Sequence, residues 1–271
     1  MIDRTVLELI YLIGCAANRQ APDPKLTAET DFNALKKLAS RQALASACGY
    51  ALELAGGGSG GYWQNAYLSV VRRSLMFENE RSSILAQLEK EGIWYLPLKG
   101  ILIEKMYPER GIRDMADNDI LVDPDRMDDL RRLMKARGYE VREGAHDIEC
   151  IKAPVFNFEM HYRLFDEATD AFEKYFRDVS RFFAETPGKA PEGRFFERSM
   201  SREYMYIYGA AHEHKHFANS GHGIRGLLDN YVMRRFFASC ETGPDGMRSL
   251  SGAANGLDMD LIDRELEKLG I

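Results

Sequence analysis

The chain has 271 residues and a net charge of −6 at pH 7, with 45% hydrophobic and 29% charged residues. This composition is typical of a globular protein with a sizeable core, built as one large domain or as a core with helical additions. The acidic balance argues against strong non-specific binding to nucleic acid, although it leaves a local basic groove open.

The four cysteines lie far apart and form no CxxC pair: Cys15, Cys48, Cys150 and Cys240. Their spacing argues against a zinc ribbon and a disulfide scaffold, so we expect buried or free thiols in a reducing cytosol. The apolar stretch 6–17 follows Asp3 and is interrupted by Glu8, which indicates an amphipathic helix instead of a signal peptide. No apolar run reaches the ~18 residues that span a membrane, and we expect a cytoplasmic protein.

The first 91 residues predict a helical region. Apolar residues recur at helical spacing over 6–17, 32–54 and 62–91, and Gly92 ends the last of these helices. The glycine-rich run 56–61 predicts a loop. A phosphate-binding loop would need the Walker lysine and Ser/Thr after it, and both are missing.

After Gly92 the pattern changes to short apolar runs that alternate with helical segments. Four short strands are predicted, at 93–96, 119–122, 139–142 and 148–152. A short helix fits 101–107. A second helix begins at Asp123-Pro124 and ends at Gly138, because Asp is a good cap and Pro suits the first turn.

The segment 155–164 is the clearest strand, because apolar and polar residues alternate along it. Such alternation is what a sheet with one core face and one solvent-facing side requires. The core face holds Phe156, Phe158, Met160, Tyr162 and Leu164, and the other face holds Asn157, Glu159, His161 and Arg163. Helical patterns return at 202–217, 223–237 and 257–269.

These elements predict an α+β protein with a small mixed β-sheet flanked in sequence by helices. We expect three regions. An N-terminal helical region covers 1–91, an α/β core covers 92–166, and a mainly helical C-terminal region covers 167–271.

Two carboxylates, Asp117 and Asp119, stand two residues apart at the start of a predicted strand. Side chains at i and i+2 point to the same side, so these two project together. Upstream, Lys99-Gly100 lies at a strand-to-helix junction, where glycine lets a phosphate approach the backbone and Lys99 adds a positive charge. Downstream, Glu159 lies on the polar face of the clearest strand.

Three carboxylates that converge repel one another unless a cation lies among them. Mg²⁺ prefers oxygen ligands and keeps several waters, so two or three carboxylates together with phosphate oxygens suit it, or Mn²⁺ in its place. Two such ions bind the attacking and the leaving oxygens of an in-line displacement at phosphorus. Asp117, Asp119 and Glu159 therefore predict a metal-dependent site for phosphorus chemistry, in which positioning and charge neutralisation dominate.

A resemblance to a known family rests on several runs: Leu96-Pro97-Leu98-Lys99-Gly100, Tyr107-Pro108, Arg113, Asp117-Asn118-Asp119-Ile120-Leu121-Val122 and Phe158-Glu159-Met160-His161-Tyr162. Weaker matches are Ala210-Ala211-His212 with His216, and Leu227-Leu228-Asp229. Over roughly residues 60 to 240 the chain resembles the uncharacterised nucleotidyltransferase family of bacteria, within the polymerase-β-like nucleotidyltransferase superfamily.

The resemblance implies that 92–166 is a nucleotidyltransferase-like core and that Asp117, Asp119 and Glu159 bind the metal. It also implies a nucleoside triphosphate as co-substrate, with ATP as the expected one, and it does not name the acceptor. The superfamily usually has Gly-Gly or Gly-Ser after its first strand, whereas this chain has Lys99-Gly100, so the details of triphosphate binding stay open.

Each site residue also has a structural explanation. The two aspartates are consistent with a solvated turn, and Glu159 with one exposed polar residue whose rivals, Asp147 and Glu149, lack the alternating strand. Lys99 is also consistent with a surface lysine. Arg113 either holds a phosphate or pairs with a nearby acid, and His161 either orients a carboxylate, touches substrate or is structural.

The run His212-Glu213-His214-Lys215-His216 fits the H-E-x-x-H zinc-protease pattern, with His212 and His216 one helical turn apart. That pattern needs a third ligand and a protease fold. The resemblance implies histidines in this helix without a protease role, so we rank structural or substrate-lining histidines above zinc ligands.

The sequence therefore leaves three functions. The favoured one is a Mg²⁺-dependent nucleotidyltransferase that moves a nucleoside monophosphate to an unidentified acceptor, a small molecule more readily than a protein or RNA. The second is a catalytically inactive nucleotide-binding or interaction module. The third is a zinc hydrolase that uses His212, Glu213 and His216.

Overall fold

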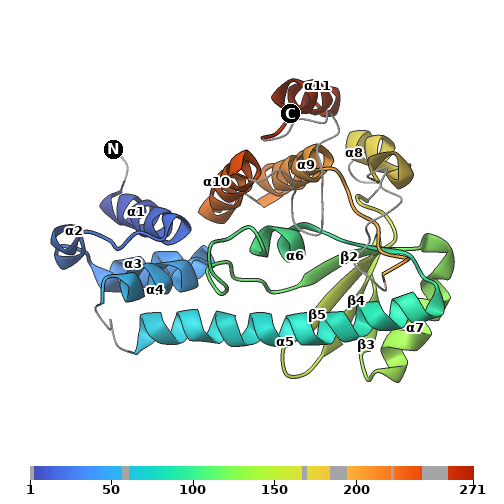
Figure 1. The fold of residues 1–271 in the computed structure, drawn as a ribbon, viewed down its shortest axis with the longest axis horizontal. Coiled ribbons are helices and arrows are strands. Elements are labelled where there is room, and N and C mark those ends of the chain that lie inside the picture. The colour runs from blue at the N-terminus through green and yellow to red at the C-terminus, as the bar shows by residue number, and fades with distance from the viewer. Residues whose placement is uncertain (1–2, 57–60, 167–169, 184–193, 221–222, 240–255) are drawn as a thin grey trace. The chain divides into compact units, whose positions relative to one another are not determined.

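The computed structural model describes residues 3–56, 61–166, 170–183, 194–220, 223–239 and 256–271 (Figure 1). Most of the glycine-rich run predicted as a loop, and Cys240, lie outside these residues. The chain folds as two compact units: Met1–Glu78, Ile103–Met115 and Gly223–Val232 form the first, and Asn79–Leu102, Ala116–His222 and Met233–Ile271 form the second. The three-region division along the sequence stays a prediction.

The first unit is built mainly from N-terminal helices, namely α1 (Arg4–Asn18), α2 (Pro24–Ala28), α3 (Phe32–Arg41), α4 (Ala45–Leu54) and the beginning of α5 (Tyr62–Glu91). Helix α1 packs on α3 and α4, and Leu9, Leu35 and Ala47 of these helices are fully buried. The predicted stretch 32–54 is broken into two helices, because Ala43 adopts a left-handed φ of 54°.

Helix α5 runs unbroken for 30 residues, as the sequence predicts, and contributes residues to both units. Gly92 ends it with a φ of 65°, a conformation that glycine adopts without steric cost. The backbone N–H of Gly92 donates to the carbonyl of Glu89 (3.2 Å) and thereby satisfies one of the last carbonyls of the helix.

The second unit contains a five-stranded sheet in the order β1-β2-β5-β4-β3 (Figure 1). Its strands are β1 (Tyr95–Pro97), β2 (Asn118–Val122), β3 (Glu140–Glu143), β4 (Asp147–Lys152) and β5 (Phe156–His161). Neighbouring strands are antiparallel except β2 and β5, which are parallel. The η1 turn (Pro124–Arg126), capped by Asp123, leads into α7 (Met127–Ala136) between β2 and β3. The α+β fold class predicted from the sequence is confirmed.

One face of this sheet is apolar and packs toward α5. Ile120 of β2 and Phe158 and Met160 of β5 are fully buried on it. Asn118 shares the face and accepts a hydrogen bond from Arg81 of α5 (2.5 Å). With this side occupied by α5, the side chains of Asp119, Glu159 and His161, at the alternate positions, point to the opposite face.

Helices after the sheet complete the second unit: α8 (Asp170–Phe176), the η2 turn (Val179–Phe182), α9 (Arg202–Ser220), the end of α10 (Ile224–Ser239) and α11 (Met259–Leu269). An aromatic cluster holds α9 against α8 and η2. Neighbouring rings of Phe165, Phe176, Phe182 and Tyr208 have centroids 5.0, 5.1, 5.7 and 5.9 Å apart. The cluster therefore fixes the helix that carries Tyr208 and His212.

Among the described residues, no helix has the length and apolarity to cross a membrane.

Replacing Phe158 with Ala should lower the free energy of unfolding by ~3–5 kcal/mol, because a fully buried ring on a central strand leaves a cavity. Urea denaturation measures this. Phe195→Ala is the matched control, since that ring is 79% exposed and its loss should change stability by less than ~0.5 kcal/mol. Equal losses in the two variants would contradict the sheet described above.

Candidate active site

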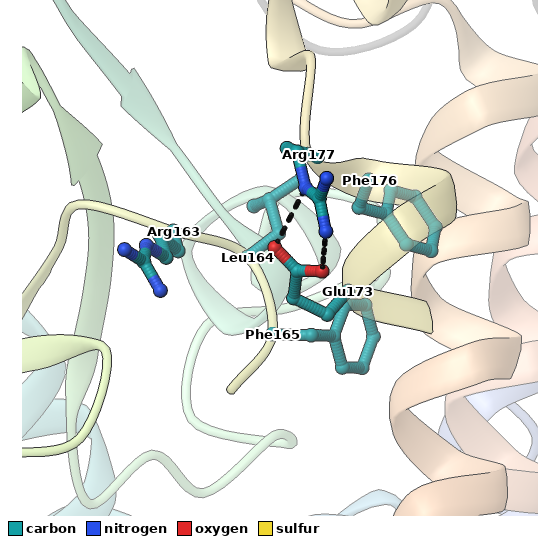
Figure 2. Close-up of a pocket in the computed structure, with 6 residues that line it drawn as sticks. All are labelled: Arg163, Leu164, Phe165, Glu173, Phe176 and Arg177. Atoms are coloured by element: carbon teal, nitrogen blue, oxygen red, sulfur yellow. Dashed lines mark hydrogen bonds and ion pairs between the residues drawn. The ribbon is translucent and has the colours of Figure 1, made fainter. Parts of the chain in front are cut away.

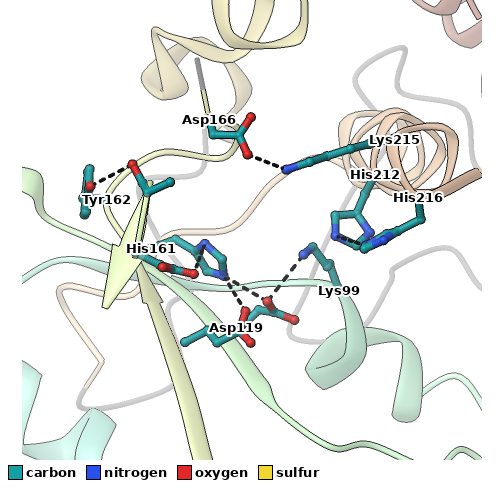
Figure 3. Close-up of polar contacts among 11 residues, drawn as sticks. Lys99, Asp119, His161, Tyr162, Asp166, His212, Lys215 and His216 are labelled. Carbon is teal, nitrogen blue, oxygen red and sulfur yellow. Dashed lines mark hydrogen bonds and ion pairs between the residues drawn. The ribbon is translucent and has the colours of Figure 1, made fainter. Parts of the chain in front are cut away.

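The pairing of β1 with β2 places Lys99 beside Asp119. Pro97 pairs with Ile120, and just beyond the strand the backbone N–H of Leu98 donates to the carbonyl of Asp119 (3.0 Å). Lys99 then begins α6 (Lys99–Glu104) with a φ of 35°, which is strained for a residue that has a side chain. Its ammonium lies 3.4 Å from Asp119 Oδ1 (Figure 3).

The parallel pairing of β2 with β5 brings the predicted acidic residues together. Asp119 is the register partner of Glu159, and Leu121 is the register partner of His161, so all four share one face. His161 Nε2 lies 2.9 Å from Asp119 Oδ1 and 3.7 Å from Glu159 Oε2. The ligand atoms of Asp119, Glu159 and His161 all lie within 4.8 Å of one another, close enough for one metal ion.

Asp117 and Gly100 flank this group. Asp117 immediately precedes β2 and is half-buried, and its charge acts on both Glu159 and Lys99. Gly100 is buried in the first turn of α6. The predicted roles of Asp117 in metal binding and of Gly100 at the triphosphate stay predictions.

The electrostatics of the group follow from the crowding of carboxylates around one lysine. Burial alone favours a neutral Asp119, but the Lys99 ammonium and the hydrogen bond from His161 outweigh it and hold the pKa of this carboxyl well below its usual range. Burial likewise opposes the charge on Lys99, and the nearby Tyr208, Asp119 and Glu159 outweigh it and raise the pKa of Lys99. At neutral pH the two form an ion pair.

Glu159 behaves in the opposite way. Burial, followed by repulsion from Asp119 and Asp117, raises its pKa to about 8. Lys99 opposes this shift without cancelling it. Burial and the two nearby carboxylates together therefore favour the protonated form of Glu159 at neutral pH. The site thus favours an added positive charge.

The polar side of β5 is less exposed than its alternation predicts. His161 is 2% exposed, so the expectation of a solvent-facing side is wrong at this position. The physical reason is that His161 lies between Asp119 on β2 and Asp147 on β4, with strands on both sides. Of the two rivals of Glu159, Glu149 lies 3.7 Å from the guanidinium of Arg142, and Asp147 lies beside His161.

Arg113 belongs to the first unit, whereas Asp119 belongs to the second. Nε and Nη2 of Arg113 both donate to Asp229, at 2.9 Å each, and the side chains of Arg113 and Asp229 are 8% and 7% exposed. Tyr107 also donates to Asp229 (2.7 Å). Of the two explanations that the sequence left open, these contacts favour pairing with an acid, and phosphate binding by Arg113 stays a prediction.

The histidine pair on α9 lies near the Lys99 ammonium, whose charge acts on it (Figure 3). Nε2 of His212 lies 3.1 Å from Nε2 of His216. Burial, and then the charges of Lys99 and His216, lower the pKa of His212 to about 2, so this ring is neutral. In the part of the chain that the structure describes, neither histidine belongs to a group of three possible metal ligands, so the third ligand of a zinc protease is not found there.

A pocket of about 290 Å³ lies beside the segment that follows β5 (Figure 2). It is lined by Arg163, Leu164, Phe165, Glu173, Phe176 and Arg177. Glu173 accepts two hydrogen bonds from Arg177, at 3.0 and 2.6 Å, which hold one wall of the pocket in place. None of the carboxylates around Lys99 lines it, so the pocket and the acidic group are formed by different side chains.

Two neighbours of the acidic group were not predicted from the sequence. Tyr208 lies under the Lys99 ammonium, 5.7 Å from Nζ to the ring centroid, and His146 lies beside His161, with ring centroids 5.3 Å apart. Tyr208 falls on a regular helical pattern that gave no sign of a site. The antiparallel pairing of β4 with β5 aligns Asp147 with His161 and so brings the adjacent His146 close to that ring. The turn between β4 and β5 sets this register, and it is the sequence signal that could have predicted the contact.

The match to a family model supports the sequence resemblance. The model of a family described as uncharacterised nucleotidyltransferase matches residues 28–243, which is most of the chain. The solution structure of the antibiotic-resistance factor ANT(2'')-Ia has 16% sequence identity and a TM-score of 0.40, over 56% of this chain and 79% of that one. The crystal structure of an antigenic nucleotidyltransferase-like protein from Paracoccidioides brasiliensis has 12% identity and a TM-score of 0.38, over 76% and 93%. No curated protein matches the sequence.

Replacing Arg113 with Ala should destabilise the protein by ~3–5 kcal/mol, because it leaves the buried carboxylate of Asp229 without its main cation. Thermal or urea unfolding measures the loss. Arg110→Ala is the control in the same unit: its side chain is 37% exposed and pairs with Glu78, and an exposed pair contributes ~1 kcal/mol or less. An Arg113→Ala variant as stable as the control would show that the pair with Asp229 has no structural importance.

Proposed function

Because the chain belongs to the uncharacterised nucleotidyltransferase family, we propose that it transfers a nucleoside monophosphate from a nucleoside triphosphate to an acceptor hydroxyl or a similar group. The expected donor is ATP, and the reaction depends on Mg²⁺ or Mn²⁺. Asp117, Asp119 and Glu159 hold the metal, and Lys99 and Gly100 contact the triphosphate.

One observation supports this proposal above the others: Asp119 and Glu159, 40 positions apart in number, are register partners on the two parallel strands. Their side chains share one face, and Lys99 stands at the edge of the same group, 3.4 Å from Asp119. Two carboxylates and a lysine around one point match the requirements of phosphorus chemistry, which needs a bound cation and positive charge near the phosphate oxygens.

The residues fit a hard divalent cation. The raised pKa of Glu159 reflects burial and then repulsion from Asp119 and Asp117, and a cation among these carboxyls removes that repulsion. When bound, the cation neutralises charge on the phosphate oxygens and orients them. His161 donates from Nε2 to Asp119 Oδ1, which fixes the orientation of that carboxylate.

The transfer is an in-line displacement at the α-phosphorus. An oxygen of the acceptor forms a bond to phosphorus as the bond from phosphorus to the bridging oxygen breaks, and pyrophosphate leaves with that electron pair. Glu159, as the carboxylate, takes the proton that the acceptor hydroxyl loses. Lys99 stabilises negative charge on the phosphate oxygens, and its ammonium lies beside Asp119 and over the Tyr208 ring.

The acceptor we propose is a small molecule, since the acidic chain is not suited to a large RNA. His212 and His216 line the acceptor side in this proposal, and neutral His212 is suited to hydrogen bonding without a charge. The buried His161, which the sequence also left as a substrate contact, acts instead through its hydrogen bond to Asp119. We also propose that the protein acts in the cytoplasm, as the sequence predicts.

Replacing Asp119 with Asn should weaken Mg²⁺-dependent binding of a non-hydrolysable ATP analogue by at least ~10-fold, because it removes a metal ligand. Titration calorimetry with and without Mg²⁺ measures this. Asp128→Asn, whose side chain is 94% exposed on α7, is the matched control and should bind as the unmodified protein does. Metal-dependent binding that survives Asp119→Asn would rule out the assignment. Binding without turnover over many acceptors would indicate an inactive nucleotide-binding module.

The Mg²⁺ affinity should rise with pH and level off above about pH 8, because Glu159 must lose its proton to bind the metal and its pKa is raised to about 8. Below that pH the affinity should fall by up to ~10-fold per unit. Calorimetry at pH 7 in buffers of different ionisation enthalpy should show about one proton released per ion bound. The Glu159→Gln variant should lose this pH dependence, and an unchanged profile in that variant would contradict the assignment.

A further inference from the structure

A second group of metal-type ligands lies next to the acidic group, on the other side of His161. His146, Asp147 and His161 each offer one ligand atom, and these atoms all lie within 4.8 Å of one another. His161 is shared, because its Nε2 faces Asp119 while its Nδ1 lies 3.9 Å from Asp147 Oδ2. The two groups therefore meet at opposite nitrogens of one ring.

The hydrogen bonding of His161 engages Nε2 and leaves Nδ1 without a partner among the described residues. A carboxylate accepts hydrogen bonds and does not donate them, so we assign a proton to Nε2, which lies 2.9 Å from Asp119 Oδ1. Nδ1 is buried and has no hydrogen-bond partner among the described residues. Asp147 Oδ2 lies 3.9 Å from Nδ1, which is too far for a hydrogen bond.

The distance between these two atoms matches the separation of two ligands of one metal ion. Two ligands bound at ~2.1 Å lie at most ~4.2 Å apart, so 3.9 Å between His161 Nδ1 and Asp147 Oδ2 leaves room for one ion between them. His146 adds a third metal ligand, and its buried Nδ1 also has no hydrogen-bond partner among the described residues. A buried polar atom without a partner is costly, and a cation shared by the three side chains removes that cost.

The backbone around the group is already fixed. The N–H of Gly144 donates to the carbonyl of Asp147 (3.0 Å), and the N–H of Tyr162 donates to the carbonyl of His146 (3.1 Å). The Tyr162 hydroxyl donates to the carbonyl of Ala145 (3.0 Å). These bonds fasten the turn between β3 and β4 to the end of β5, so the backbone that carries the three ligands is held in place.

We propose that His146, Asp147 and His161 bind a divalent transition-metal ion of the zinc and cobalt class, separate from the Mg²⁺ of the acidic group. Two imidazoles and one carboxylate suit such ions, whereas Mg²⁺ requires oxygen ligands. Half-exposed His146 and Asp147 leave the ion open to water as a further ligand. An ion on Nδ1 keeps the proton on Nε2, where it orients Asp119, so this site acts on the acidic group through one ring.

The test is titration of metal-free protein with Co²⁺ in the presence of excess Mg²⁺, followed by calorimetry and by the visible absorption of bound Co²⁺. We expect one tightly bound Co²⁺. His146→Gln and, separately, Asp147→Asn should each weaken its binding by at least ~10-fold. Glu159→Gln should leave it unchanged, because Glu159 belongs only to the acidic group. Far-ultraviolet circular dichroism confirms that the variants fold.

Three results would overturn the proposal. One is the absence of Co²⁺ binding, which would show that the three side chains do not form a metal site. Another is loss of binding in Glu159→Gln with retention in His146→Gln, which would place the ion in the acidic group. The third is loss in His212→Gln alone, which would place it on α9. None of these bears on Mg²⁺-dependent nucleotide binding, whose loss in Asp119→Asn tests the proposed function separately.

Discussion

The parallel pairing of β2 with β5 is the interaction on which the candidate site depends. It aligns Asp119 with Glu159 and Leu121 with His161, and it turns the carboxylates away from the apolar face covered by α5. A slip of one residue would move every side chain of a strand to the other face of the sheet. The buried Ile120, Phe158 and Met160 oppose such a slip, so the packing of the core also sets the geometry of the site.

The surroundings act in opposite ways on the two carboxyls of the acidic group. Asp119 is stabilised as a carboxylate by Lys99 and His161, whereas Glu159 is driven toward the protonated form by burial and by its acidic neighbours. The two carboxyls thus have pKa values displaced in opposite directions within one small group. Displacements of this kind are common at functional sites, where the surroundings are arranged for a ligand and not for the empty protein. His161, between Asp119 and Asp147, connects this group to the neighbouring set of ligands.

Much of the fold follows from local sequence patterns, and the contacts between distant residues do not. Helical spacing and Gly92 predict α5, and alternation predicts β5, because both signals lie within one segment. The order of the acidic residues in the sequence suggested Asp119 and Glu159. Their alignment, however, requires β5 to pair directly with β2, although β3 and β4 lie between these strands in the sequence, and only tertiary packing determines that pairing. The burial of His161 and the pair of Arg113 with Asp229, 116 positions apart, depend on tertiary structure in the same way.

The most direct test of the central claim is a crystal structure with Mn²⁺ and a non-hydrolysable nucleoside triphosphate, using the anomalous signal of manganese to locate the ion. Mn²⁺ takes the oxygen ligands that Mg²⁺ prefers, so it reports the same site. We predict an anomalous peak between the carboxylates of Asp119 and Glu159, in contact with phosphate oxygens, with the Lys99 ammonium beside the phosphates. Nucleotide bound without a metal at these carboxylates, or manganese found only at His212 and His216, would contradict the account.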